Sequence, residues 1–553
     1  MEYIARGIPL AQAFIGVDVG TGSARAGIFD RAGRLLATAR QSIQVWHEAG
    51  DIVEQSSEDI WRACAMSIRA AMGEAKLHPP DIGGLGFDAT CSLVVLGEKA
   101  QPLTVSPSGD DRRNVIVWMD HRAIEQAERI NRTGHEVLRY VGGVISPEME
   151  TPKILWLKEH LPSTYAKARE YYDLADYLTY RATGDRARSV CTVTCKWTYL
   201  AHERSWSADY FQRIGLSELA ADDFARIGNR IVEPAVALGR GLTETAAHEL
   251  GLAPGTPVGA SLIDAHAGAV GTIGAAIDGS NAGVNVLDRL AYIMGTSACI
   301  MASTAEPSFV PGVWGPYFSA MLPGRWLNEG GQSAAGAGID YLVQSHPAFR
   351  EAAEKSEAAR LGVLEYLESS AVARSPSVSG TAYLARHIHV LPEFLGNRSP
   401  FAEPDARAAI MGLDLDRSLG NLESLYVATL CGLSYGLADV VDALRDRNVA
   451  CGLMVISGGA AKSPLVRQIM ADTTGLDVAL PATPEPVLLG AAMLGAVAAK
   501  AYPSIDQAMG AMSRIREITH PNAGTAAFHA AKRKIYTLLR ELDRETRLIM
   551  RAV

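Results

Sequence analysis

The sequence lacks the marks of several protein classes. No apolar run reaches the roughly 18 residues that a membrane-spanning helix needs. The first 13 residues contain one arginine and a short apolar patch, unlike the charged start and long apolar run of a secretory signal. No Walker A motif occurs, so a phosphate site would have to be built in another way. We therefore expect a cytoplasmic protein without a membrane partner.

Cysteine is also scarce. The seven cysteines are an odd number and are scattered along the chain. Cys191 and Cys195 are four residues apart, but no second pair or histidine pair stands at metal-binding spacing. The pattern predicts reduced thiols in a cytosolic protein rather than a disulfide framework or a zinc site.

An excess of positive charge is absent as well. The formal net charge is −9, with acidic and basic residues mixed, so nothing indicates nucleic acid as a partner. Hydrophobic residues make up 48% and charged residues 20%, as in a globular protein with real cores. A chain of 553 residues is long enough for two large domains.

The first part of the chain reads as a meander followed by helix–strand alternation, which predicts a mixed α/β sheet. Apolar runs and tight turns predict strands over residues 13–19, 24–30, 34–45, 82–87 and 92–96, the last continuing the sheet. A capped amphipathic helix is predicted to begin at Ser57.

A similar unit recurs half a chain later. Strands predicted over 289–294 and 298–303 flank Gly295-Thr296-Ser297, as the first two strands flank Gly20-Thr21-Gly22-Ser23. Two such hairpins indicate a duplicated architecture. Loop-rich segments at 253–257 and 279–283 bracket a boundary, which predicts lobes over 1–275 and 276–553. Further helices are predicted over 332–343, 419–444, 464–474 and 487–500, and strands over 453–456 and 477–480.

The turn after the first strand has the composition of a phosphate site. Gly20 and Gly22 let the backbone approach a ligand closely, and successive amides there form an anion nest. Asp18 is suited to hold Mg²⁺, which prefers oxygen ligands and keeps several waters. Taken alone, the turn is equally well explained as an ordinary glycine-rich hairpin. The residues assigned to the phosphates are Thr21, Gly22, Ser23 and Arg25.

Asp264 follows an apolar run and precedes small residues. A carboxylate at the end of a buried strand suits a general base that accepts a hydroxyl proton. The alternative is a helix N-cap, and two residues later His266 reads as structural rather than catalytic.

Two further small-residue segments follow. Gly295, Thr296 and Ser297 provide a second phosphate turn, unless they form a plain loop. A strand that ends in a Gly-Gly pair before a helix leaves room for a flat base or a ribose. Its residues are Gly458, Gly459, Ala460 and Ser463.

These four motifs, in this order, resemble the FGGY carbohydrate kinases, and the resemblance runs from about residue 13 to about residue 500. It implies a two-lobed actin-like ATPase fold, with an RNase H-like α/β core in each lobe and MgATP and sugar in the cleft. It assigns Asp264 as the catalytic base, with Asp18 and Asp264 near Mg²⁺. One departure concerns the sugar-side signature: Lys153 to Leu157 fits it, but Glu148 and Glu150 do not.

Within that family the chain resembles the D-ribulokinase-like pentulose kinases. The resemblance lies in the segments 90–95, 118–123, 195–197 and 329–333. A polyol needs several convergent polar partners, and the residues assigned to the sugar are Thr90, Cys91, Asp120, His121, Lys196, Asp264 and Glu329. Three of them have a structural alternative: Asp120 pairs with Arg122 or caps a helix, Lys196 is a surface lysine, and Glu329 is a helix charge.

The predicted reaction is ATP-dependent phosphorylation of D-ribulose to D-ribulose 5-phosphate, with Mg²⁺. Kinases for L-ribulose, D-xylulose or ribitol remain alternatives, as do a non-kinase actin-like ATPase and a sugar sensor. The sequence leaves the oligomeric state open, a homodimer being one option. Residues 504–553 read either as a closing helix of the second lobe or as an oligomer contact.

Overall fold

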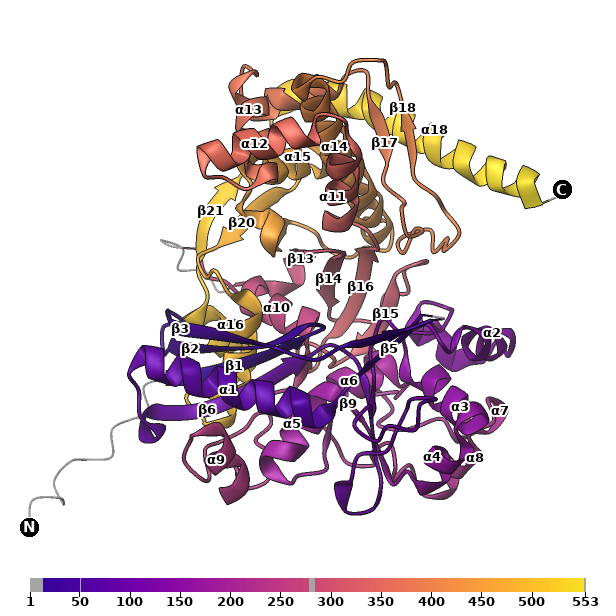
Figure 1. The fold of residues 1–553 in the computed structure, drawn as a ribbon, viewed down its shortest axis with the longest axis vertical. Helices are drawn as coiled ribbons and strands as arrows, with labels where there is room; N and C mark the ends of the chain where they lie inside the picture. Colours follow the sequence, from indigo (N-terminus) through magenta and orange to yellow (C-terminus); the bar gives the residue numbers. More distant parts are fainter. Residues whose placement is uncertain (1–12, 50, 278–283, 552–553) are drawn as a thin grey trace, which may run out of the picture.

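The computed structural model describes residues 13–49, 51–277 and 284–551. It has two lobes, the second above the first in Figure 1, each built around a β-sheet. Most of the N-terminal segment and the 279–283 part of the expected boundary lie outside the described residues.

The sheet of the first lobe has the strand order β3-β2-β1-β6-β12. Its first three strands are antiparallel neighbours, whereas β6 runs parallel to both β1 and β12. The bounds are β1 Ala13–Gly20, β2 Ser23–Asp30, β3 Leu35–Ser42, β6 Ile82–Ala89 and β12 Leu262–Ile263. The strands predicted over 13–19, 24–30 and 82–87 are thus confirmed, whereas the strand predicted over 34–45 ends at Ser42.

The sheet of the second lobe repeats this arrangement. Its order is β15-β16-β14-β13-β19-β20-β21. The five neighbouring strands β16-β14-β13-β19-β20 have the same antiparallel and parallel pairings as the first sheet. The bounds are β13 Arg289–Met294, β14 Ala298–Thr304, β15 Trp314–Phe318, β16 Trp326–Gln332, β19 Leu453–Ser457, β20 Asp477–Pro481 and β21 Ile515–Thr519. The predicted duplication is confirmed.

A third sheet lies beside the first, in the order β4-β5-β8-β7-β9. The bounds are β4 Trp46–Glu48, β5 Ile52–Gln55, β7 Leu93–Leu96, β8 Val115–Ile116 and β9 Glu170–Asp173. The prediction that residues 92–96 continue the first sheet is therefore wrong. Thr90 to Ser92 redirect the chain between β6 and β7, so that β7 pairs with β8 and β9 instead.

Two short sheets complete the strands: β10 Arg188–Ser189 with β11 Ile231–Val232, and β17 His389–Leu391 with β18 Ala409–Met411. The helices of the first half are α1 Ser57–Ala75, α2 Ile124–Arg132, α3 Glu150–His160, α4 Pro162–Lys167, α5 Leu174–Thr183, α6 Val190–Lys196, α7 Ala208–Arg213, α8 Ser217–Ala221, α9 Glu244–Leu250 and α10 Asp264–Ile273. The cap of α1 is Ser56, one residue earlier than predicted, because its side chain accepts the hydrogen bond from the Asp59 amide.

The second half contributes α11 Gly336–Ser345, α12 Phe349–Ala359, α13 Val363–Ala373, α14 Leu419–Arg445, α15 Pro464–Thr474, α16 Pro486–Ala498, α17 Ile505–Met512 and α18 Ala526–Arg551. The helix predicted over 332–343 starts later, because Gln332 still belongs to β16 and pairs with Ala298. Among the described residues, only α14 is long and apolar enough to cross a membrane, and 83% of its apolar window is buried in the protein, as in a core helix.

Helix α16 belongs to the second half of the chain but lies against the first sheet (Figure 1). Gly16 of β1 makes this contact possible, since a Cβ there would stand 1.9 Å from the Leu488 carbonyl oxygen. Glycines 84 and 86 of β6 meet the same helix backbone. The boundary at residue 275 therefore stays a prediction. The core of the first lobe includes residues from both sides of it, because α16 packs against the first sheet.

Candidate active site

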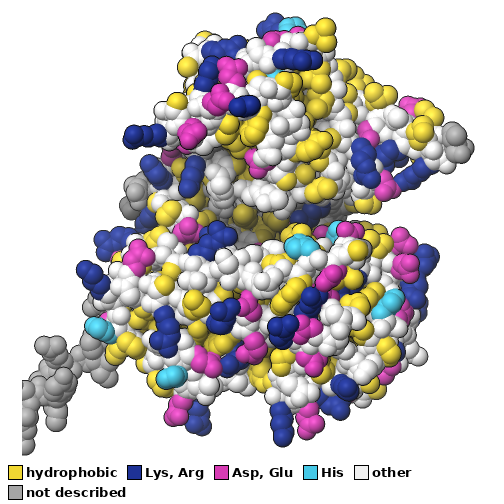
Figure 2. All heavy atoms as spheres, in the orientation of Figure 1, with side chains coloured by type: hydrophobic (Ala, Val, Ile, Leu, Met, Phe, Trp, Pro, Cys, Tyr) yellow, Lys and Arg dark blue, Asp and Glu magenta, His cyan; other side chains and the backbone are white. Residues whose placement is uncertain are grey.

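The two predicted phosphate turns are the tips of equivalent hairpins that face the cleft. Figure 2 shows the surface hollowed between the lobes. Thr21 and Gly22 join β1 to β2, and Gly295 to Ser297 join β13 to β14. In the second turn the Ala335 amide donates to the Thr296 carbonyl at 3.0 Å, which ties the turn to the start of α11. A Cβ on Gly22 would meet no atom within 4 Å, so open space lies beside the first turn.

Three carboxylates meet at the ends of neighbouring strands in the first sheet. Asp18 of β1 lies opposite Asp88 of β6, and Leu262, two residues before Asp264, is also in register with Asp88. Asp88 was not predicted, although its place at the end of an apolar strand resembles that of Asp18. It is fully buried, neither of its oxygens has a hydrogen-bond partner, and burial and Asp18 hold its pKa well above the usual range.

Arg25 is held by carboxylates. Its Nε and Nη2 donate to Asp18 Oδ2, the former at 2.8 Å, and its Nη1 donates to Glu485 Oε2 at 2.8 Å. Glu485 stands directly before α16, so this ion pair joins the two halves of the chain. The arrangement makes Arg25 a residue that orients Asp18, in addition to the phosphate contact predicted for it.

Asp264 is the first residue of α10 and is half-buried in the cleft. The preceding Ile263 occupies the N-cap position, so Asp264 does not form the usual side-chain cap that was its structural alternative. Its Oδ1 accepts the Ala265 amide at 2.7 Å. Burial, and then the negative charge of Asp18, raise the pKa of Asp264 to about 6.

The predicted sugar residues Lys196 and Glu329 come together in a buried cluster. Arg398 donates to Glu329 Oε1 at 2.8 Å, and both Lys196 and Arg398 lie over the ring of Trp314, at 4.7 and 4.2 Å from its centroid. Burial opposes ionisation of Glu329, but Lys196, His266 and Arg398 outweigh it and lower its pKa. Arg398 and Trp314 were missed, because they follow no motif and approach the site only through the packing of the second lobe.

His266 links this cluster to the first lobe. Its Nε2 lies 3.2 Å from Glu329 Oε2, and its Nδ1 lies 3.0 Å from the sulfur of Cys191. Burial opposes the charged forms, but Cys195 and His266 lower the pKa of Cys191, and Cys191 and Glu329 raise that of His266. The structural role expected for His266 thus becomes a specific one: it holds the Glu329 carboxylate.

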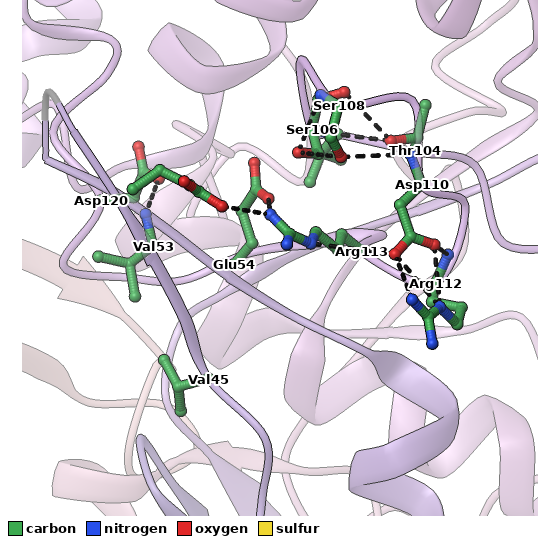
Figure 3. A network of polar contacts seen from close by, with 12 residues as sticks. Val45, Val53, Glu54, Thr104, Ser106, Ser108, Asp110, Arg112, Arg113 and Asp120 are labelled. Atoms are coloured by element: carbon green, nitrogen blue, oxygen red, sulfur yellow. Dashed lines mark hydrogen bonds and ion pairs between the residues drawn. The ribbon is translucent and has the colours of Figure 1, made fainter.

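Asp120 is committed to structure. The Val53 amide donates to its Oδ2 at 2.7 Å (Figure 3). Arg122 donates to both of its oxygens. Arg122 also donates to Glu54 at 2.9 Å. The structure thus has the Asp120–Arg122 pair that was the alternative to sugar binding. The contacts of Asp120 do not support the prediction that it binds sugar.

The other sugar-side residues differ in exposure. His121 is partly exposed, with Nε2 at 3.7 Å from Glu148 Oε1. His121, Arg398 and Lys196 lower the pKa of Glu148 against the effect of burial, so this departure from the family pattern lies among the cations of the site. Thr90 and Cys91 are buried at the turn after β6.

Glu150 and Lys153 form a fully buried ion pair at the start of α3, with Lys153 Nζ 3.5 Å from Glu150 Oε1. Burial raises the pKa of Glu150 to about 7. Trp156, also buried, packs against the Arg122 guanidinium at 4.9 Å, which matches the core-packing interpretation of that residue.

A cavity of about 1190 Å³ opens beside the second turn. Its walls include Gly295 and Thr296 on one side and Gly459, Ala460 and Ser463 on the other. Gly458 has a φ of 92°, and a Cβ there would stand 2.3 Å from the Met294 carbonyl oxygen, so only glycine lets the two strand ends approach. The rest is lined by apolar side chains from α11, α13 and α14 and by polar ones that include Asp340, Glu365 and Glu368. The apolar part suits a flat base.

No group of three or more acidic, histidine or cysteine side chains in the described part of the chain is placed to hold a metal by itself. Asp18 and the partnerless Asp88 beside it nevertheless supply the oxygen donors that Mg²⁺ prefers, and a bound cation would favour the ionised form of Asp88 against the effect of burial. A site of this kind fits Mg²⁺, which keeps several waters and takes further ligands from a nucleotide.

Comparison with known proteins gives the same picture. Residues 13–271 match the N-terminal domain, and residues 290–499 the C-terminal domain, of the FGGY family of carbohydrate kinases. An FGGY carbohydrate kinase domain-containing protein of Homo sapiens is 45% identical over 541 residues, 97% of this chain and 98% of the relative. A D-ribulokinase of Saccharomyces cerevisiae is 36% identical over 520 residues, 89% of this chain and 73% of the relative.

Among solved structures, a xylulose kinase from Lactobacillus acidophilus superposes with a TM-score of 0.78 at 18% identity, covering 96% of this chain and 98% of the other. This likeness concerns the fold. The predicted two-lobed actin-like ATPase fold, with a mixed sheet flanked by helices in each lobe, is confirmed.

Proposed function

The chain belongs to the FGGY family of carbohydrate kinases, and on that premise we propose that it transfers a phosphoryl group from ATP to the terminal hydroxyl of D-ribulose. The observation that carries the proposal is the placement of Asp264, half-buried between the strand end of Asp18 and the Lys196–Glu329 cluster. A carboxylate so placed faces the phosphates on one side and the sugar on the other.

The chemical step divides among the residues of the cleft. Asp264 accepts the proton of the terminal hydroxyl of the sugar while the oxygen of that hydroxyl bonds to the γ-phosphorus of ATP. The bond between the γ-phosphorus and the β–γ bridging oxygen breaks, which releases ADP. At neutral pH most of the Asp264 carboxylate is ionised, since its pKa is about 6. The amides of the two turns hold the phosphates, and the cavity beside Gly459 takes the adenosine.

The sugar hydroxyls are held by the buried charges. Lys196 and Arg398 donate hydrogen bonds and Glu329 accepts them, which gives a polyol both kinds of partner. Asp18, with Asp88 beside it, and Asp264 would hold Mg²⁺, which when bound neutralises charge on the phosphates. Arg25 keeps Asp18 oriented toward that position.

D-ribulose is proposed over other sugars for two reasons. The D-ribulokinase of Saccharomyces cerevisiae is similar over most of this chain. The segment Thr90 to Val95, which carries the resemblance to D-ribulokinases, is buried and begins at the end of β6, two residues beyond Asp88. That segment therefore lies where a sugar would meet the first lobe.

A substrate panel tests the proposal. ADP release is measured with D-ribulose, L-ribulose, D-xylulose and ribitol, and D-ribulose is expected to have the highest kcat/KM, by about tenfold or more. A higher value for another sugar would contradict the substrate but keep the kinase. ATP hydrolysis unaffected by any sugar would indicate a non-kinase ATPase, and sugar binding without turnover would indicate a sensor.

A further inference from the structure

The last helix, α18, uses only one of its faces in the fold. His529, Lys532, Tyr536 and Leu539 are buried against the second lobe. Lys532 donates to the Ala385 and Ile388 carbonyls at 2.6 and 2.7 Å, and Arg533 pairs with Asp439 and Asp442. In Figure 1 the C-terminal part of this helix extends beyond the body of the lobe.

The opposite face of α18 carries an apolar stripe. Leu538 and Leu542 are each 61% exposed and Ile549 is 60% exposed. Ala531 is exposed and Ile535 partly so. The spacings of four, three, four and seven residues are those of a heptad seam, and at about 100° per residue they set the stripe about 100–160° around the helix from Tyr536. Isolated exposed leucines are common, but a heptad row is the pattern of a helix that packs against another helix.

We propose that this stripe is the contact surface for α18 of a second copy of this chain, packed antiparallel about a two-fold axis. In a two-fold contact the same patch serves both copies, so it has to be complementary to itself. The first four residues of the stripe meet this condition when Ile535 lies opposite Leu538 of the second copy, because Ala531 then lies opposite Leu542 of that copy. Ile549 lies beyond the paired part of the helix.

The flanking charges agree with the same register. Lys534 and Glu541 are both exposed and stand on one side of the stripe. Antiparallel packing in this register brings Lys534 of each copy beside Glu541 of the other, which gives two complementary pairs. A parallel pairing would instead place Glu545 of one copy opposite Glu545 of the other within the seam, where the two negative charges repel each other.

The size of the contact sets its strength. A single pair of helices buries less than the ~1,200 Å² that a stable interface usually needs, which places the contact among weak, transient ones. The dimer should therefore form and dissociate with concentration, with a Kd on the order of micromolar.

Sedimentation velocity of the full chain tests the surface. The wild-type protein is expected to shift from monomer to dimer as its concentration rises, and Leu538→Glu together with Leu542→Glu to leave only monomer. A matched control, Arg544→Glu, changes an exposed residue of the same helix outside the stripe and should still dimerise. Circular dichroism checks that each variant is folded.

A charge exchange tests the register. Glu541→Lys puts lysine beside Lys534 of the second copy and should weaken dimerisation about tenfold, whereas Lys534→Glu combined with Glu541→Lys should restore it. A monomeric wild type throughout the range, or a dimer unaffected by the stripe variants, overturns the proposal. Neither result bears on the kinase, since α18 contributes no residue to the cleft described above.

Discussion

At the scale of single residues, the cleft depends on charges placed where water is scarce. Asp18, Asp88 and Asp264 lie at one edge of the first sheet, where burial and the charge of Asp18 raise the pKa of both Asp88 and Asp264. On the sugar side the opposite holds, because Lys196, His266 and Arg398 keep Glu329 charged. The neighbouring groups thus shift the pKa values in opposite directions, upward for Asp88 and Asp264 and downward for Glu329.

Replacing the proposed base should separate chemistry from binding. Asp264→Asn is expected to lower kcat for the sugar by about 10²–10⁴-fold, since the amide cannot accept the hydroxyl proton. Nucleotide affinity, measured by calorimetry, should change little. Full turnover in this variant would remove Asp264 from the role of base.

The activity should also report the raised pKa of Asp264. Because the protonated acid cannot accept a proton, kcat/KM should fall on the acid side as pH drops through about 6, rather than near the ordinary value of 3.8. Rates measured between pH 5 and 8, with folding checked at each pH, test this. An acid limb near pH 4 would contradict it.

His266 is a positioning residue, whose effect should appear in sugar binding. Its Nε2 contacts the charged Glu329, and hydrogen bonds to charged groups contribute about 1.5–3 kcal/mol. His266→Leu should therefore raise KM for the sugar by about tenfold or more with KM for ATP unchanged. His266→Gln, which keeps a donor, should recover part of the loss; equal effects of both variants would refute the positioning role.

At the scale of elements, helix α16 shows how a late segment completes an early sheet. β1 and β6 present glycines where the helix backbone passes, and the hydrophobic residues of α16 fill the space around them. The glycine positions are ordinary in the local sequence. Their role appears only when residues more than 400 positions apart come into contact.

This packing predicts contrasting effects of two glycine substitutions. Gly16→Ala should destabilise the protein by about 1–3 kcal/mol or more, because its Cβ would overlap the Leu488 carbonyl. The control Gly73→Ala, in α1 with no atom within 4 Å, should be neutral or stabilise by up to about 1 kcal/mol. Urea unfolding measures both, and equal stabilities would contradict the close approach.

At the scale of the whole molecule, the two lobes share one site. Cys191 and His266 of the first lobe and Glu329 of the second lobe form a continuous series of contacts. The phosphate turns come one from each lobe. Catalysis therefore requires both lobes at once, and closure on the substrates would exclude water from the transfer.

Closure should be visible in solution. Small-angle scattering with the sugar and a non-hydrolysable ATP analogue together should give a smaller radius of gyration than the free protein, with smaller changes for either ligand alone. Asp264→Asn, which is expected to bind both, should close as well. An unchanged radius in the ternary complex would show that the lobes are already closed.

The sequence alone determined the elements and the order of the motifs. Apolar runs and turns marked β1, β2, β13, β14 and the helix α15, since these depend on local periodicity and turn chemistry. The glycine turns and Asp264 were identified in the same way. Each is a short stretch whose neighbours in sequence are also its neighbours in space.

Only the tertiary structure decided which side chains meet. It joined the Asp120–Arg122 pair to Val53 and Glu54 of β5, brought Arg398 and Trp314 to Lys196 and Glu329, and set Asp88 beside Asp18. It also placed α16 under the first sheet and left one stripe of α18 exposed. The physical reason is the same in each case: burial and partnership are set by contacts between distant segments, which no local pattern records.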